Sequence, residues 1–324
     1  MFTSSKMEEL AARLVAERGI TPSTAAGYIR ILYALNGKQA FKNINFLKKT
    51  ADIDAILAPY AESTKKTMLA AIVSCLSTQP KGFGAASKHY LGGMNEAIKS
   101  ASEAPKHVKS TKQTENWIDW KDVLEKQTAL EAVIAPLYKK KTLTEAEFNQ
   151  LQNAVILGLY TYSEPRRNKD FLDMRIVASA PPDVTDANWL DLKANQFVFN
   201  VYKTAKHHGV QKFPIPADFQ PLLKAYIRFH PVWNGPARKA IQKQATGCPF
   251  LVHYDGTEFT AQNAITRILN KILGRNAGSS ILRHSFLTSK YGDELLDMKA
   301  TADKMGHSVS QQREYVLTED APDA

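Results

Sequence analysis

A change in composition near residue 105 most constrains the fold, because it divides the chain into two parts. The segment "SEAPKHVKSTKQTE" (residues 102–115) contains a proline and several lysines but few apolar residues. Such a composition is typical of a linker between domains. We therefore predict one domain over residues 1–104, a basic linker over residues 105–114 and a second domain over residues 115–324. The 324 residues, 44% of them hydrophobic, are enough to give each domain a core.

Before the linker, apolar residues recur at helical spacing. One stripe with the i, i+3, i+4, i+7 pattern consists of Tyr28, Ile31, Leu32 and Leu35. Thr21 has the side chain and position of a helix N-cap for this segment, and Pro22 suits the first helical position. We predict a small all-helical bundle for the first domain.

After the linker, the pattern mixes helix and strand. Thr144 and Glu147 have the spacing of a capping box, which predicts a helix through Tyr160. Three short alternating segments follow, at residues 189–192, 197–201 and 213–216, and "YKTAKHHGVQK" between the last two predicts a hairpin tip. The pattern is helical again from Thr260. The expected fold class is therefore mostly α with a small three-stranded antiparallel sheet (α+β).

The charge of the chain indicates a polyanionic partner. The formal net charge is +10 and the isoelectric point is about 9.3, and nucleic acid is the commonest partner of such proteins. A basic but unspecialised surface would give the same totals. The residues that we expect to contact DNA are Lys65 and Lys66 in the first domain, Lys106, Lys109 and Lys112 in the linker, and Arg166, Lys206 and His284 in the second domain. An ordinary solvated helix face is an equal alternative for the first pair.

Two cysteines, Cys75 and Cys248, have unrelated sequence contexts and no paired spacing. This predicts a reducing compartment and argues against a zinc ribbon or a disulfide scaffold. No apolar run is long enough to span a bilayer, and the N-terminus lacks a secretory apolar region. We expect an intracellular protein, in the cytoplasm or in a host nucleus, that is neither secreted nor inserted in a membrane. Phosphate-loop, HExxH, GxSxG and dinucleotide motifs are missing, so no cofactor and no metal are expected.

Five short segments contain residue types that suit phosphodiester chemistry. They are "EPRRNKD" with Arg167, "YKT" with Lys203, "SSILRHSF" with Arg283, "MGHS" with His307 and "REYV" with Tyr315. A tyrosine phenol has a pKa of ~10, so it becomes a useful nucleophile only where cationic donors stabilise the attacked phosphate. Each residue alone is more often structural. Their joint order along one chain is what indicates a site.

In this order, the residues resemble the tyrosine recombinase (integrase) superfamily, most of all the integrases of large DNA viruses and their mobile elements. Around the first arginine, Arg167 and Asp170 fit the family's pattern, and Arg166 is the alternative if the register is shifted by one. The family's lysine lies between the second and third strands, where Lys203 is found, with Lys206 as the alternative.

The later segments carry the rest of the resemblance. "LRHSF" matches the family's second arginine at Arg283, and the Gly-His turn matches at His307. Tyr315 lies eight residues beyond His307 (315 − 307), within the spacing that the family allows. One position departs, because Ser280 stands where the family usually has a histidine, three residues before Arg283. His284 is adjacent to that arginine but on a different helical face, so it is not expected to substitute.

The resemblance implies a helical, SAM-like core-binding domain followed by a catalytic domain. Arg167 and Arg283 would clamp the phosphate with guanidiniums that keep their charge. Lys203 would protonate the departing 5′ oxygen, and His307 would donate a hydrogen bond to the phosphate. Tyr315 would attack and form a covalent 3′-phosphotyrosine, so that rejoining needs neither ATP nor metal.

Ser280 could still hydrogen-bond a phosphate oxygen, but it is a poor proton acceptor, so slower chemistry is expected. The implied partner is double-stranded DNA, synapsed by a homotetramer that forms from a monomer or weak oligomer. The implied role is integration or excision of a mobile or viral element. Two alternatives stay open. One is a type IB-like topoisomerase, which uses the same residue set to relax supercoils. The other is a catalytically weakened DNA-binding protein on the same scaffold, motivated by Ser280.

Overall fold

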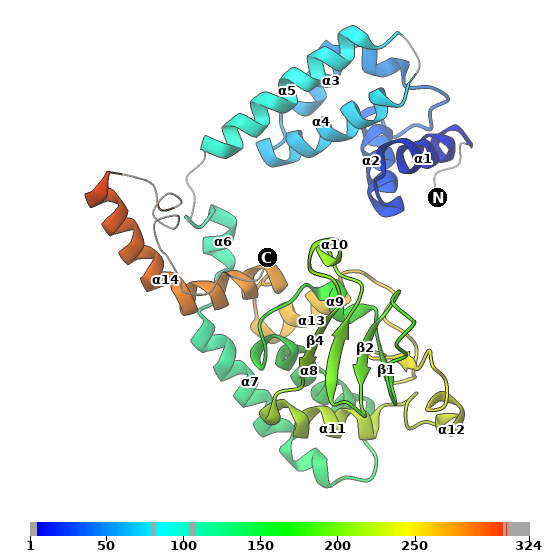
Figure 1. The fold of residues 1–324 in the computed structure, drawn as a ribbon, viewed down its shortest axis with the longest axis vertical. Coiled ribbons are helices and arrows are strands. Elements are labelled where there is room, and N and C mark those ends of the chain that lie inside the picture. The colour runs from blue at the N-terminus through cyan, green and yellow to red at the C-terminus, as the bar shows by residue number, and fades with distance from the viewer. Residues whose placement is uncertain (1–4, 80–81, 104–107, 307–308, 310–324) are drawn as a thin grey trace. The chain divides into compact units, whose positions relative to one another are not determined.

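The computed structural model describes residues 5–79, 82–103, 108–306 and 309, and the chain divides into two compact units (Figure 1). Unit 1 is Met1–Val108 and unit 2 is Lys109–Ala324. The division falls inside the segment that the sequence marks as a linker. The end of that segment is corrected, because Ser110 caps a helix, α6 (Thr111–Asn116), through a reciprocal capping box with Gln113. The side-chain oxygen of each residue accepts the other's backbone N–H, which satisfies donors that a helix start otherwise leaves free.

Unit 1 is helical throughout its described part. Its elements are α1 (Ser5–Arg18), α2 (Pro22–Leu35), the 3₁₀ turn η1 (Asn45–Lys48), α3 (Thr50–Leu57), α4 (Glu62–Ser77) and α5 (Gly84–Glu103). Thr21 caps α2 as predicted, since its Oγ1 accepts the backbone N–H of Thr24 at 3.2 Å. The predicted helical bundle is therefore present as secondary structure.

The core of unit 1 is almost entirely apolar. Fully buried side chains from four helices, among them Leu14, Leu32, Ile72 and Tyr90, form one cluster. The Tyr90 hydroxyl donates to the carbonyl of Leu47 at 2.8 Å, which holds α5 against η1. Burial of apolar area in this cluster is the main stabilising contribution, at about 25 cal/mol per Å².

Unit 2 surrounds a small sheet with helices. Its helices before the sheet are α6, α7 (Trp120–Ile134), η2 (Ala135–Lys139), α8 (Glu145–Thr161) and α9 (Asn168–Leu172). Its strands are β1 (Met174–Val177), β2 (Asn188–Asp191), β3 (Gln196–Phe199), β4 (Gln211–Pro214) and β5 (Cys248–Pro249). The helices between and after the strands are α10 (Ala205–His208), η3 (Ala217–Phe219), α11 (Gln220–Phe229), α12 (Arg238–Ile241), α13 (Ala264–Leu273) and α14 (Ser279–Met305).

The sheet differs from the predicted one. The three expected strands are β2, β3 and β4, and they pair antiparallel. The sheet nevertheless has five strands in the order β4-β3-β2-β1-β5, with β1 parallel to β2 and antiparallel to β5. A mixed sheet arises because the long connection after Val177 returns the chain to pair β2 alongside β1, which a tight turn cannot do.

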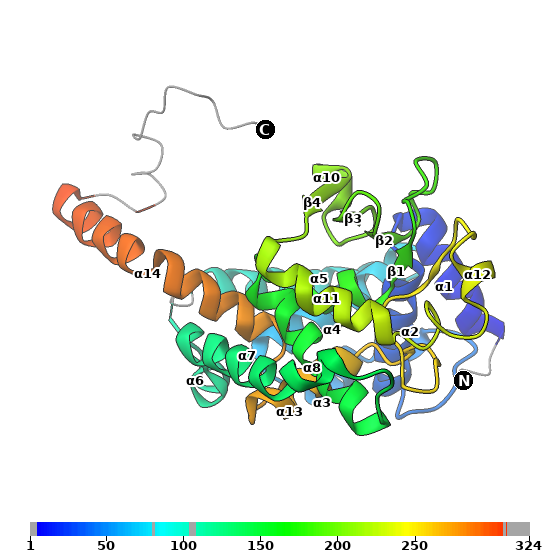
Figure 2. The ribbon, with the colours of Figure 1, turned by 90° about the horizontal axis from the view of Figure 1, so that it is seen from below.

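The two faces of the sheet pack differently because side chains alternate along each strand. Ile176, Leu190 and Phe197 belong to the main core, together with α8 and α13. Trp189 and Val198 point to the other face and form a small separate cluster with the connection between β1 and β2. In unit 2, Figure 1 shows α10 at one end of the sheet and α11 at the opposite end, and Figure 2 shows α7, α8 and α13 together beneath it. Among the described residues, none of the helices has both the length and the apolar composition that a membrane crossing requires.

Candidate active site

Arg167 lies where the chain turns from α8 into α9. The residue is the N-cap of α9, with an extended backbone (φ −76°, ψ 146°), and its side chain is half-buried. Its carbonyl accepts the backbone N–H of Asp170 at 3.0 Å, which closes the first turn of the helix. Asp170 is only 3% exposed. The turn therefore presents an arginine beside a buried carboxylate.

Arg283 lies in the second turn of α14. Its Nε donates to the carbonyl of Ser279 at 3.3 Å, and the side chain is half-buried. Partial burial lowers the pKa of Arg283, the positive charge of Arg167 lowers it further, and the Asp170 carboxylate opposes both effects. Two guanidiniums interact in this way only when they lie near each other. The structure thus brings together the two arginines that sequence analysis had singled out.

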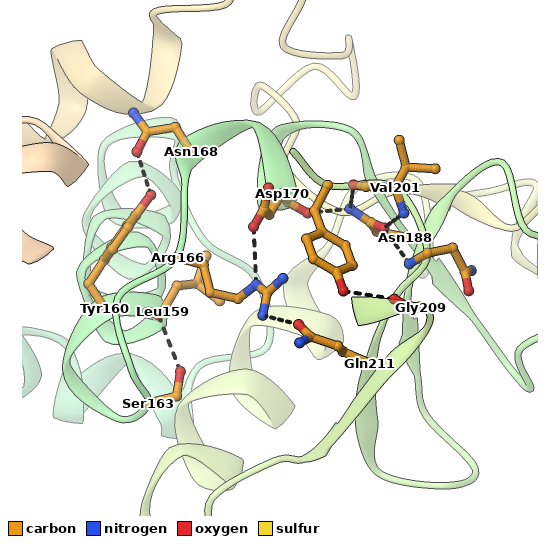
Figure 3. Close-up of polar contacts among 12 residues, drawn as sticks. Leu159, Tyr160, Ser163, Arg166, Asn168, Asp170, Asn188, Val201, Gly209 and Gln211 are labelled. Carbon is orange, nitrogen blue, oxygen red and sulfur yellow. Dashed lines mark hydrogen bonds and ion pairs between the residues drawn. The ribbon is translucent and has the colours of Figure 1, made fainter. Parts of the chain in front are cut away.

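Tyr160 completes this cluster, and sequence analysis did not assign it a role. Its ring is fully buried, and its hydroxyl donates to Oδ1 of Asn168 at 2.7 Å (Figure 3). Burial raises its pKa strongly, Asp170 raises it further and Arg283 lowers it. The phenol therefore stays protonated and acts as a structural donor. The amide of Asn168 in turn donates to Thr266 of α13 at 2.8 Å, which anchors α9.

Lys203 lies on the connection between β3 and β4. The connection, residues 200–210, is wider than the simple hairpin tip that the sequence suggested, because it contains the short helix α10. Gly209 ends α10 with φ +63°, a conformation that a side chain disfavours. The side chains of Lys203 and Lys206 are both exposed. Each ammonium is therefore accessible to a ligand placed outside this end of the sheet.

Ser280, the residue that departs from the expected histidine, lies at the surface near the start of α14. Ser280 is exposed in the first turn, and His284 is exposed one residue after the half-buried Arg283. Successive residues of a helix project about 100° apart, which gives His284 and Arg283 different directions. No described contact involves the Ser280 hydroxyl, and it is free to donate to a bound oxyanion.

Arg166 has surroundings unlike those of its neighbour. Its Nε donates to Oδ2 of Asp170 at 3.1 Å, and its Nη1 donates to Oε1 of Gln211 at 2.9 Å (Figure 3). The guanidinium also lies over the ring of Phe199, with its carbon 3.9 Å from the ring centre. These contacts use the Nε–H group and one Nη1–H group of Arg166 and cover one face of its guanidinium. The geometry favours Arg167 over Arg166 as the arginine available to a ligand.

The lysines proposed for DNA contact have mixed environments. Lys65 pairs with Glu62 at 2.8 Å, which reduces the positive charge it offers, whereas Lys66 is exposed. The Lys109 ammonium lies 3.6 Å from the centre of the Trp117 ring, a cation–π contact, and Lys112 is exposed on α6.

Three of the predicted residues cannot be placed. Lys106, His307 and Tyr315 lie outside the described residues. Within the described part of the chain, histidine, cysteine and acidic side chains do not gather in groups of three that could hold a metal ion.

The described site has two half-buried arginines whose charges influence each other, and an exposed lysine on the connection between β3 and β4. The sequence matches no model of a known protein family, and no curated protein sequence matches it. Functional inference therefore depends on the chemistry of these residues and their order along the chain.

Proposed function

We propose that the protein is a DNA strand-breaking and rejoining enzyme that acts through a covalent 3′-phosphotyrosine, as a tyrosine recombinase does. The observations that carry the proposal are the order of Arg167, Lys203 and Arg283 along the chain and the placement of Arg167, before α9, and Arg283, in α14, close enough for their charges to influence each other. Two adjacent guanidiniums repel each other, so their approach costs free energy unless an anion offsets it. Asp170 offsets part of this repulsion, and a phosphodiester would offset more.

The proposed reaction assigns one step to each group. The Tyr315 phenol loses its proton to water as its oxygen attacks the phosphorus, the bond from phosphorus to the 5′ oxygen breaks, and Lys203 gives a proton to that oxygen. The non-bridging oxygens, which carry negative charge in the transition state, are held by Arg167, Arg283 and His307. The reverse attack by a 5′ hydroxyl rejoins the strand, so the phosphate bond energy is conserved.

The DNA would be engaged by both units. The exposed lysines Lys66 and Lys112, on different units, can each release a counterion from a phosphate. We propose a homotetramer on DNA that integrates or excises a mobile or viral element. The second candidate is a DNA-binding protein without catalysis, which the exposed Ser280 in place of a histidine favours.

A nicked duplex tests the proposal, since it traps any adduct by letting the short cleaved strand diffuse away. Purified protein is mixed with candidate element-end sequences without metal, and a denaturing gel is read for a protein–DNA adduct. The adduct should form, disappear in Tyr315→Phe, and fall by roughly 100-fold or more in Arg283→Ala, because removal of one oxyanion donor has an effect of that size.

Arg175→Ala is the matched control. Arg175 also donates to two carbonyls, those of Thr246 at 2.5 Å and Gly247 at 3.2 Å, but it does so at the β1–β5 edge. This variant should keep the full rate. DNA binding without any adduct would instead support the binding-only candidate, and relaxation of every plasmid would support the topoisomerase.

A further inference from the structure

We propose that Arg166 is a positioning residue that fixes the Lys203 connection relative to the Arg167 turn. The inference rests on the proposed function, since it assigns Arg166 to the proton-donating half of that reaction. Two adjacent arginines would then have separate tasks. Arg167 would bind the phosphate, and Arg166 would place the acid that protonates the leaving oxygen.

The first observation is that Arg166 contacts both ends of the connection. On the incoming side its guanidinium carbon lies 3.9 Å from the Phe199 ring centre and 5.0 Å from that of Tyr202, the residue before Lys203. On the outgoing side its Nη1 donates to Gln211 at 2.9 Å, and the Phe213 ring centre is 5.7 Å away. One side chain therefore spans the base of the segment that carries Lys203.

The second observation is the link from Arg166 to the Arg167 turn. Arg166 Nε donates to Asp170 Oδ2 at 3.1 Å, and the two side chains are 18% and 4% exposed. Burial raises the pKa of Asp170, and the charge of Arg166 opposes that rise. A buried carboxylate with a cationic partner makes a directional contact that water weakens little. Asp170 thus links Arg166, which contacts the connection that carries Lys203, to the turn that presents Arg167.

Hydrogen bonds of Asn188 and Tyr202 hold the backbone of the connection that carries Lys203. The amide of Asn188 donates to the carbonyls of Asp170 and Val201, both at 2.9 Å (Figure 3). Its Oδ1 accepts the backbone N–H groups of Asn200 at 2.9 Å and Val201 at 2.8 Å. The Tyr202 hydroxyl closes the connection by donating to the Gly209 carbonyl at 2.7 Å. Lys203 follows directly, so its backbone position is set by these contacts although its side chain is exposed.

The contacts of Arg166 favour a positioning role over direct phosphate binding. Its Nε and Nη1 donors are already used by Asp170 and Gln211, and its face is covered by Phe199. A substitution at Arg166 should therefore impair protonation of the leaving oxygen more than it impairs charge stabilisation on the phosphate. That split is measurable.

The experiment uses a leaving group that needs no proton. A thiol has a pKa of about 8.5, far below that of an alcohol, so a thiolate departs without an acid. Two nicked duplexes are compared, one with the normal 5′ oxygen at the scissile phosphate and one with sulfur in that position. Adduct formation is timed for the full-length protein and for Arg166→Met, which keeps an aliphatic chain over Phe199 but loses the charge and the fork.

With the oxygen substrate, Arg166→Met and Lys203→Ala should each lower the rate by ~100-fold, the lower range for general acid catalysis. With the sulfur substrate, both should come within about 5-fold of the unchanged protein, a limit set well below that range. Arg167→Ala should be slow with both substrates, and the control Arg175→Met should be normal with both. Combining Arg166→Met with Lys203→Ala should add little, because the two residues act as a unit.

Gln211→Met is a second variant in case Arg166→Met does not fold. It leaves the Arg166–Asp170 pair intact and removes only the contact of Arg166 to β4. It should show the same oxygen-specific loss, by several-fold. Equal losses on both substrates, or no loss on oxygen, would overturn the inference while leaving the proposed function standing. No adduct from the unchanged protein on either substrate would overturn the proposed function and this inference with it.

Discussion

The cores of the two units differ in how they use polar side chains. Among the described residues of unit 1, Thr78 is the buried polar side chain, and its hydroxyl bonds only near neighbours, donating to the carbonyl of Cys75 and accepting from Nε2 of Gln79. The described part of unit 2 buries a larger set: Gln127, Gln152, Asp170, Asn188, Asp191, His230 and Ser285. Apolar contacts are non-directional, whereas buried hydrogen bonds require one geometry. The buried polar groups of unit 2 therefore constrain the placement of its segments more strictly than the apolar core of unit 1 does.

The hydrogen bonds of unit 2 also join residues far apart in the sequence. The amide of Gln152 in α8 donates to the Tyr226 hydroxyl at 3.0 Å and to the Val252 carbonyl at 2.7 Å. Tyr226 donates onward to the Phe250 carbonyl at 2.8 Å. Removing one member leaves the others buried without partners, at a cost of about 1–3 kcal/mol for each group. Unit 1 has few such dependencies in its described core.

The largest test of this difference is Asn188→Leu. The substitution leaves four backbone groups without their partner, two carbonyls and two N–H groups. We expect the free energy of unfolding of unit 2 to fall by about 4 kcal/mol, with unit 1 unaffected. All four tryptophans lie in unit 2, so their fluorescence in a denaturant titration follows that unit. Modification of Cys75, which is buried in unit 1, follows the other.

The matched control is Thr78→Val in unit 1, which removes two local hydrogen bonds, one to the Cys75 carbonyl and one from the side chain of Gln79. It should lower the stability of unit 1 by about 1 kcal/mol. If Asn188→Leu lowers the free energy of unfolding by no more than this, the buried polar groups of unit 2 do not constrain its segments more strictly than those of unit 1.

A second test uses pH, because unit 2 buries a neutral histidine. His230 Nδ1 accepts the backbone N–H groups of Val232 at 3.3 Å and Trp233 at 3.0 Å, so the ring proton is assigned to Nε2, which faces the Phe250 carbonyl. Burial lowers the pKa of His230 to about 4, against about 6.5 for an exposed histidine. Between these two pKa values, the His230 imidazole is protonated in the unfolded chain but neutral in the folded chain.

Stability from this group is fully present above pH ~6.5 and is lost as the pH falls toward ~4, by about 3 kcal/mol. Tryptophan fluorescence in denaturant, repeated across this range, measures the loss. The same profile for His230→Gln isolates the contribution, because every other titrating group is shared. Parallel profiles for the two proteins would show that His230 is not the group responsible.

The smallest test compares one helical glycine in each unit. In α8, a Cβ on Gly158 would lie 2.6 Å from Cε2 of the buried Phe219 ring, so Gly158→Ala should destabilise unit 2 by about 2 kcal/mol through overpacking. In α5, a Cβ on Gly93 would lie 3.7 Å from the Leu69 side chain, an ordinary contact. Gly93→Ala should stabilise unit 1 by about 0.5–1 kcal/mol, because alanine loses less backbone entropy in a helix.

Fluorescence and Cys75 modification again separate the two effects. Opposite signs would support tight packing at α8 and open packing at α5. A stabilised Gly158→Ala variant would show that the Phe219 ring can move and that the core of unit 2 is less strict than described.

Local features were predictable because their causes lie within a few residues. The capping box at Thr144 and Glu147 is confirmed, with reciprocal bonds of 3.0 and 3.3 Å, and so is the Thr21 cap of α2. The strands β2, β3 and β4 lie in the expected segments. The pairing of β1 with β2 and β5 was missed, because the choice of partner for four- and two-residue strands depends on distant segments.

The candidate site shows the same limit. The sequence by itself determined which residue types are available and their order, including Arg167, Lys203 and Arg283. The sequence pattern favoured Arg167 and kept Arg166 as the alternative if the register is shifted by one, because two adjacent arginines have the same propensity and charge. Only the tertiary structure gives the two arginines different surroundings: Arg166 contacts Asp170, Phe199 and Gln211, whereas the charge of Arg167 acts on Arg283. The physical reason is that a side chain's partners come from segments that only the folded chain brings together.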